Sequence, residues 1–176
     1  MSEAERIKEL VRRAFAKVAR PPNGALHASD EGEEGELLEK DFQDKLDWRA
    51  LDGSFLDEAP GGFGSALSFF TPEAMRYFLP AYLIADLDGR LERVDVAYRL
   101  SAPFTDAART TPVNPSRFGK RTRFESGAER FAIFTPEEVA AIVAYLEHKL
   151  AASDEDLTPV REALANYWRP RLTHRA

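Results

Sequence analysis

The sequence predicts a mainly α-helical protein: a single compact domain over residues 1–176, with about five to seven helices and at most a small two-stranded sheet. Two observations predict this fold. Apolar residues recur in several stretches at the three- and four-residue spacing of an amphipathic helix. A threonine followed by proline, a helix start signal, precedes three of these stretches, at Thr71, Thr135 and Thr158.

In the N-terminal third of the chain, the sequence predicts one long helix and two short ones. Ser2 and Glu5 have the spacing of a capping box, and an unbroken apolar stripe follows: Ile7, Leu10, Val11, Ala14, Phe15 and Val18. The Pro-Pro-Asn-Gly sequence at 21–24 ends this helix, and an acidic loop runs on to Glu36. A short helix is expected to bury Leu37, Leu38, Phe42 and Leu46, and Asp47 is placed to cap a turn that carries Trp48 and Leu51.

The most apolar stretch of the chain is the central helix expected from Pro72 to about Leu87. Thr71 is its predicted N-cap, and its apolar residues occupy nearly every face, so we expect it to be the most buried element. Pro80 lacks an N–H for the Arg76 carbonyl and disfavours helical geometry at the residue before it. The sequence therefore predicts a kink or break near Leu79, followed by a second helical piece.

In the C-terminal half of the chain, the sequence predicts three helices and one long loop. The first helix contains Val94, Ala97, Tyr98 and Leu100, and residues 101–130 follow as a long basic loop that contains Pro103, Pro112 and Pro115. Thr135 and Glu138 form a capping box before the next apolar stripe. The last helix starts at Thr158 and is expected to end at Pro170. Any sheet would pair Ala66–Phe70 with Phe131–Phe134.

The central segment, Leu67-Ser-Phe-Phe-Thr-Pro-Glu-Ala-Met-Arg-Tyr-Phe-Leu-Pro-Ala-Tyr-Leu83, resembles the core motif of an uncharacterised family of small bacterial proteins, a domain of unknown function. The opening helix, the 131–150 segment and the Tyr167-Trp168 pair are similar to that family's pattern as well. The resemblance implies a shared fold and a bacterial source. It implies no activity, cofactor or catalytic residue.

Composition excludes several classes of protein. The chain has no cysteine, which removes disulfides and thiolate chemistry, and no apolar run reaches the length of a membrane span. We therefore expect a cytoplasmic protein with no membrane partner. The net charge of −6 argues against a nucleic-acid partner. Charge is uneven: residues 30–58 hold 12 acidic and 3 basic residues, whereas residues 103–133 hold 6 basic and 3 acidic ones.

Four polar or amphipathic residues lie within the apolar central segment and form the first candidate site. They are Glu73, Arg76, Tyr77 and Tyr82. One interpretation is a ligand-binding or acid–base site at the helix break, with Arg76 orienting an anion. The other, which we favour, is structural: Arg76 and Tyr77 hydrogen-bond the backbone that Pro80 disturbs.

A second candidate site is the basic part of the 101–130 segment. Basic residues alternate with Phe118 and Phe124 there, a pattern that suits phosphate contact and base stacking. The basic residues are Arg117, Lys120, Arg121 and Arg123. The simpler interpretation is that this segment and the acidic one either pair with each other or are simply solvated.

No pattern predicts a metal, a cofactor or a catalytic residue. The three histidines are scattered, and no nucleophile–base set or phosphate-binding loop is present. We therefore expect a small cytosolic interaction or accessory protein without catalytic activity, whose partner is another protein. The alternatives are an enzyme or ligand-binding module near Pro80, and phosphate or nucleic-acid contact through residues 117–124.

Overall fold

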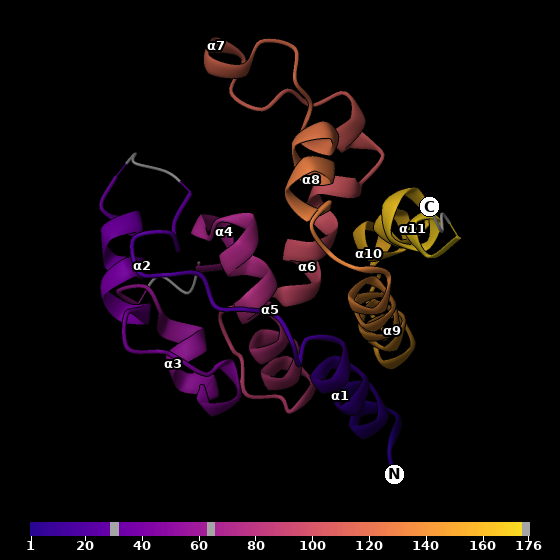
Figure 1. Cartoon of the computed structure of the whole chain (residues 1–176). Coiled ribbons are helices and arrows are strands. Elements are labelled where there is room, and N and C mark those ends of the chain that lie inside the picture. The colour runs from indigo at the N-terminus through magenta and orange to yellow at the C-terminus, as the bar shows by residue number, and fades with distance from the viewer. Residues whose placement is uncertain (29–31, 63–65, 174–176) are drawn as a thin grey trace. The chain divides into compact units, whose positions relative to one another are not determined.

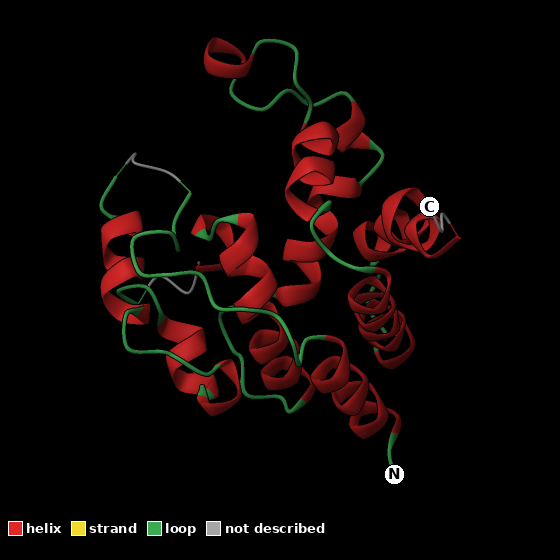
Figure 2. Cartoon of the chain, viewed as in Figure 1, coloured by secondary structure: helices red, strands yellow, loops and turns green. Residues whose placement is uncertain are grey.

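The computed structural model describes residues 1–28, 32–62 and 66–173. The α-helices in these ranges are α1 (Glu3–Ala14), α2 (Glu34–Phe42), α3 (Gly53–Glu58), α4 (Ala66–Phe69), α5 (Pro72–Leu87), α6 (Val96–Ser101), α7 (Pro115–Phe118), α8 (Arg123–Phe131), α9 (Pro136–Ala152), α10 (Thr158–Ala163) and α11 (Arg169–Thr173). Three short 3₁₀ turns, η1 (Trp48–Ala50), η2 (Ala102–Phe104) and η3 (Ala107–Arg109), and one π turn, η4 (Leu164–Trp168), complete the helical elements. The predicted mainly α-helical fold is confirmed, with more helices than expected (Figure 2).

The backbone contacts divide the chain into two compact units. One contains residues 1–7 and 97–176, and the other contains residues 8–96. Two helices, α1 and α6, each contribute residues to both units. That residues 1–176 behave as one domain stays a prediction.

The core of the 8–96 unit is built around α5, which packs against α3 and η1. Phe42 from α2 and Phe78 from α5 meet edge to face with ring centroids 4.9 Å apart, and Phe70 stacks on Phe78 at 5.2 Å. All three rings are fully buried. As predicted, Thr71 caps α5: its Oγ1 accepts a hydrogen bond from the Ala74 N–H at 3.2 Å. The same hydroxyl donates to the Ala25 carbonyl at 2.9 Å, which ties the 23–28 segment to this helix.

We expected a kink or a break near Leu79, and the break is wrong, because α5 continues from Pro72 to Leu87 with Pro80 inside it. A kink at Pro80 stays a prediction. A proline inside a helix costs about 3 kcal/mol or more through its missing hydrogen bond and its ring. Phe78, Leu79 and Tyr82 are each fully buried, and Pro80 is buried as well. Burial of this apolar surface on both sides of Pro80 stabilises the helical conformation enough to offset the local defect.

The core of the other unit is a cluster of aromatic rings. Phe104 stacks on Tyr167 with ring centroids 3.7 Å apart, and Trp168 contacts the edge of Phe104 at 5.7 Å. The Trp168 indole N–H donates to the Leu100 carbonyl at 2.9 Å. The helix does not end at Pro170 as predicted: α10, η4 and α11 continue to Thr173. The π turn ends at Trp168, two residues before Pro170. It contains Asn166, the residue whose carbonyl a normal helical N–H at 170 would bond, so the hydrogen-bond pattern is already altered there.

Three other local predictions need correction. The segments proposed for a small sheet do not form one: residues 66–69 are the helix α4, Phe131 ends α8, and turn and loop follow it to Phe134. The described residues contain two isolated bridges but no strand. The expected long loop at 101–130 is largely folded into short helical elements, and the side chain of Thr122 caps the longest of them, α8. Leu46 lies beyond the end of α2 and is 71% exposed.

Candidate functional site

The four polar residues of the central segment do not form one cluster on α5. Glu73 is exposed in the first turn, and Arg76 is half-buried on the next. Tyr77 is buried, and its hydroxyl donates to the Leu46 carbonyl at 2.6 Å. Tyr82 is nine residues beyond Glu73, on the opposite side of a helix with 3.6 residues per turn. Burial raises the pKa of Tyr82, so its phenol is neutral.

The basic candidate residues all lie on one projecting segment, residues 110–123, which we call the arm. Its two sides run antiparallel. The Arg123 N–H donates to the Thr111 carbonyl at 2.8 Å, and the Val113 N–H donates to the Arg121 carbonyl at 2.9 Å. Pro112 and Thr122 form a bridge between these bonds. The arm is therefore a narrow hairpin.

Both ends of the arm are anchored. At its start, the Thr111 N–H and hydroxyl both donate to the Ala107 carbonyl, at 3.1 and 2.8 Å. At its end, Thr122 and Glu125 form a reciprocal capping box, with bonds of 3.2 and 2.8 Å, that starts α8. These bonds hold the base of the arm to η3 and α8 and leave the tip to project.

The tip of the arm is the short helix α7, and it lies apart from the other helices of its unit (Figure 1). Asn114 before α7 has a φ of 37° and Gly119 after it has a φ of 62°, so the chain turns through a left-handed residue at each end. Asparagine and glycine adopt this region more readily than other residues. Every residue from 114 to 120 is exposed, and the Phe118 ring is 46% exposed.

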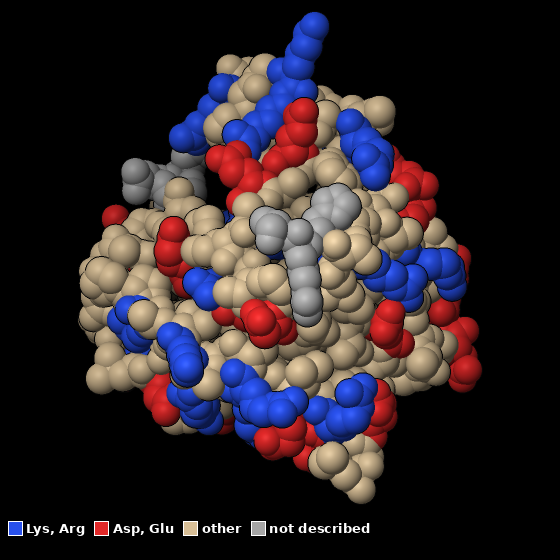
Figure 3. All heavy atoms as spheres, turned by 45° about the vertical axis from the view of Figure 1, so that its right-hand side comes forward, with Lys and Arg blue, Asp and Glu red and all other residues tan. Residues whose placement is uncertain are grey.

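Exposed cations lie on the same arm as this ring. Arg117, Lys120 and Arg123 are exposed, and the Arg117 guanidinium lies 5.3 Å from the centroid of the Phe118 ring. Arg121 is half-buried and forms an ion pair with Glu129 of α8. Figure 3 shows Lys and Arg side chains gathered at the top of the view, the height at which α7 lies in Figure 1. Arg117, Lys120 and Arg123 therefore place charged side chains at the surface of the arm.

Sequence reasoning missed one basic residue at the foot of the arm. The Arg109 guanidinium lies 4.4 Å from the centroid of the Phe124 ring, whose edge packs on Phe104 of the aromatic core. Phe124 is therefore part of the core packing and only Phe118 is a free aromatic surface. Alternation of cations and aromatics along the chain does not separate these two roles, because the difference arises from tertiary packing.

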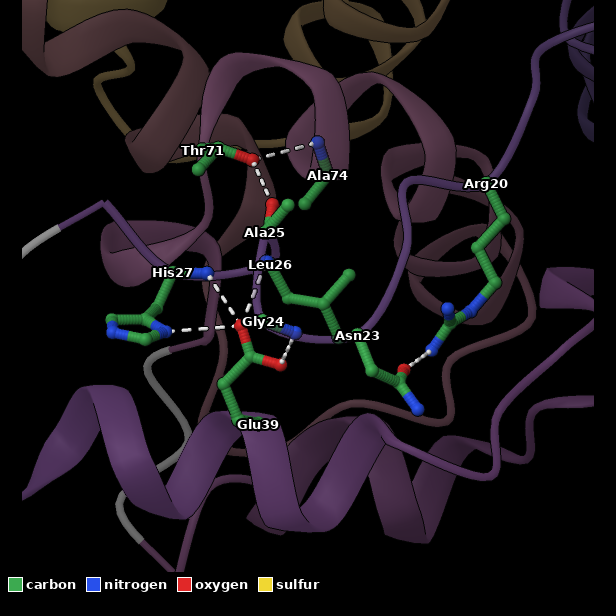
Figure 4. Close-up of polar contacts among 9 residues, drawn as sticks. All are labelled: Arg20, Asn23, Gly24, Ala25, Leu26, His27, Glu39, Thr71 and Ala74. Carbon is green, nitrogen blue, oxygen red and sulfur yellow. Dashed lines mark hydrogen bonds and ion pairs between the residues drawn. The ribbon is translucent and has the colours of Figure 1, made fainter.

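Sequence reasoning also missed two carboxylates that bind several backbone N–H groups. In Figure 4, Glu39 of α2 accepts hydrogen bonds from the N–H groups of Gly24, Leu26 and His27, and from the His27 ring. Burial alone would raise the pKa of Glu39, but the bonds from Gly24, His27 and Leu26 outweigh it and lower the pKa. This geometry fixes the 23–28 segment on α2, so we assign Glu39 a structural role.

Asp57 of α3 is the second such carboxylate. One of its oxygens accepts from the N–H groups of Glu92, Arg93 and Val94, at 3.0, 2.8 and 3.0 Å. Burial opposes ionisation, but these bonds outweigh it and lower the pKa of Asp57. Both carboxylates use their acceptor capacity within the fold, so neither is placed for acid–base chemistry on a ligand.

Within the described ranges, no group of three or more His, Asp and Glu side chains is placed to hold a metal ion. No helix of that part of the chain is long and apolar enough to cross a membrane.

Comparison with known proteins gives one match. A model of a family of unknown function, DUF6714, matches residues 3–172. No curated protein and no solved structure matches the chain. The match covers nearly the whole sequence, from the start of α1 into α11. The chain therefore belongs to the DUF6714 family of unknown function.

Proposed function

We propose that this protein is a cytosolic binding protein without catalytic activity, and that it contacts an acidic partner protein through the arm. The observation that carries the proposal is the exposed tip, residues 114–120, with a half-exposed Phe118 between the cations Arg117 and Lys120. An aromatic ring beside an arginine is typical of the residues that dominate binding at protein interfaces. The anchored base restricts the conformations of the arm, which lowers the entropy lost on binding.

An acidic partner is favoured over nucleic acid by charge. The arm is basic, but the protein as a whole carries a net charge of −6, which repels a polyanion at long range. A local acidic patch on a protein meets the arm without this penalty. The pairing of a cation with a ring also suits base stacking, so nucleic acid is the second candidate.

An enzyme or ligand site near Pro80 has less support. Glu73, Arg76, Tyr77 and Tyr82 are divided between the exposed and buried sides of α5, and the Tyr77 hydroxyl already bonds the Leu46 carbonyl. We therefore favour a structural role for these four residues.

Site-specific photocrosslinking tests the proposal. Phe118 is replaced with p-benzoylphenylalanine, and a second variant carries the same group at Tyr98, an exposed aromatic of the same unit that is 53% exposed. In living cells of the source organism, we expect discrete protein adducts from position 118 and none of them from position 98. Adding Arg117→Glu and Lys120→Glu should abolish these adducts.

Two results would contradict the proposal. The same adducts at both positions would show that the arm has no special role. Adducts that disappear on nuclease treatment would identify nucleic acid as the partner instead.

A further inference from the structure

Three exposed cations of the arm and its foot are not neutralised by the fold. Arg109, Lys120 and Arg123 are exposed, and they form no ion pair with any residue that the structure describes. The carboxylates of α8 are bonded elsewhere: Glu125 accepts from the N–H group that precedes this helix, and Glu129 pairs with another arginine of the arm. The three cations are therefore open to an external anion.

These cations follow one another from the foot of the arm towards its tip. Thr111 and Arg123 are bonded to each other across the hairpin, so Arg123 lies near the base. Lys120 is three residues nearer the tip, at most about 11 Å further along the chain. Arg109 comes two residues before Thr111, and its guanidinium lies over the Phe124 ring at the foot. We call Arg109, Arg123 and Lys120 the cation row.

The backbone of the arm is closed to a further strand. The hairpin bonds join the residues on either side of the Pro112–Thr122 bridge, so the backbone groups of these two residues point outward. Proline has no N–H to donate. The Thr122 N–H already donates to the Glu125 carboxylate at 2.8 Å, and its carbonyl accepts from the Ser126 N–H at 3.1 Å. A partner therefore contacts the arm through side chains and not by strand addition.

The arm is small for a protein interface. It comprises residues 110–123, fewer than the 20–30 residues that each partner supplies to a standard interface. Such a surface fits a short segment of a partner better than a second folded face. A segment in extended conformation advances about 3.3 Å per residue, so carboxylates two or three residues apart match the step between Lys120 and Arg123.

We propose that the arm binds a short acidic segment of its partner, which lies extended along the cation row. This inference rests on the proposed function of the arm and names the part of the partner that it contacts. Exposed pairs of a cation and a carboxylate each contribute little, so the binding is weak and depends steeply on salt.

Fluorescence anisotropy with the full chain tests the proposal. The probe is a short labelled peptide in which glutamate and serine alternate, and the control peptide has glutamine in place of each glutamate. At about 20 mM salt, where charges interact over about 20 Å, we expect saturable binding of the glutamate peptide and none of the control. At about 500 mM salt this distance falls to about 4 Å, and binding should be lost. No binding at low salt, or equal binding of the two peptides, would overturn the inference.

Charge reversal identifies the surface that binds the peptide. Lys120→Glu/Arg123→Glu should weaken binding at least about tenfold, because two attractive charges become repulsive. The matched control is Arg13→Glu/Lys17→Glu, at two exposed cations outside the arm that also form no ion pair with a described residue. It changes the net charge equally and should keep most of the affinity. Equal weakening in both variants would assign the binding to net charge and contradict the proposal. Far-UV circular dichroism verifies that each variant retains its helices.

A single substitution tests whether the contact reaches the foot of the arm. Arg109→Gln removes one charge and should weaken binding by about two- to fivefold, the effect of one exposed ion pair. Lys40→Gln removes the charge of an exposed lysine on α2 and should leave the affinity unchanged. An Arg109→Gln protein that binds as tightly as wild type would contradict the extended contact along the row.

Two further measurements separate the alternatives. A single-stranded oligothymidylate of the same charge as the peptide should compete no better than the peptide itself, and tighter binding of the oligonucleotide would overturn the inference in favour of nucleic acid. Photocrosslinking from position 118 separates failure of this inference from failure of the proposed function. Protein adducts together with no binding of the glutamate peptide would support the proposed function and exclude the extended acidic segment.

Discussion

At the scale of single residues, Asp57 joins α3 to the chain that leads into α6. Its side chain is 7% exposed and is the acceptor for three consecutive N–H groups, one of which, that of Val94, is buried. We predict that Asp57→Ala lowers the free energy of unfolding by about 1–3 kcal/mol, the cost of leaving buried donors without an acceptor. Urea denaturation followed by circular dichroism measures this change. The neighbouring Glu58→Ala removes an exposed carboxylate and should change stability little.

Glu39 makes the stability of the fold depend on pH. Its pKa in the folded protein lies below the ordinary value of 4.5, so the folded state favours the ionised form more than the unfolded state does. The stabilisation is therefore fully present above pH 4.5 and is lost as the pH falls through the lower folded pKa. We predict that the urea midpoint falls over this acidic range, and that the fall is smaller in Glu39→Gln.

The Glu39 comparison is made between pH 3 and pH 7, a range of about four pH units around the carboxyl titration. Asp57 titrates in the same direction and contributes to the fall in both proteins. The decisive quantity is therefore how much more the urea midpoint falls in the wild type than in Glu39→Gln. An identical pH profile for the two would show that the bonds to the 23–28 segment do not stabilise the folded state.

At the scale of elements, α5 is the helix on which the 8–96 unit depends. Phe78 and Leu79 are fully buried within it. We predict that Phe78→Ala or Leu79→Ala costs about 2–5 kcal/mol, because each leaves a cavity as well as losing buried apolar surface. Thermal melts measure the effect, and Leu46→Ala, at a side chain that is 71% exposed, is the control. Shifts of the melting temperature as small as the control's would show that α5 is not the core.

Helix starts were predictable from the sequence because their chemistry is local. The Thr71 cap and the Thr135–Glu138 capping box depend on residues three apart, and both formed as expected. The continuation of α5 through Pro80 was not predictable in this way, because it depends on burial by distant segments. The partner of Tyr77, the Leu46 carbonyl, is 31 residues away along the chain.

In the candidate site, too, the features that depend on distant segments were not predictable from the sequence. The sequence identified the basic residues of the arm, since charge and aromatic spacing are visible in it. It did not separate exposed Phe118 from packed Phe124, or exposed Lys120 from Arg121, which pairs with Glu129. These distinctions require the fold of the hairpin, which is set by backbone bonds between Thr111 and Arg123 and between Val113 and Arg121.

At the scale of the whole molecule, the boundary between the two units falls within helices. The helix α1 runs across residues 7 and 8, and α6 runs across residues 96 and 97. Domain boundaries normally lie in exposed, flexible linkers. Because α1 and α6 each contain residues of both units, we expect the unfolding of one unit to disturb a helix that continues into the other.

We therefore predict that the 176 residues unfold in one cooperative transition. The chain contains one buried tryptophan in each unit, Trp48 in residues 8–96 and Trp168 in residues 97–176, so each reports on its own unit. Trp168→Phe leaves only the Trp48 signal, and Trp48→Phe leaves only that of Trp168. For each variant, the fluorescence transition in urea should coincide with the transition seen by far-UV circular dichroism, which follows all the helices. The comparison is made within each variant, so a loss of stability caused by the substitution itself does not affect it. A fluorescence transition that precedes or follows the helical one would show that the two units unfold independently and that the chain comprises two domains.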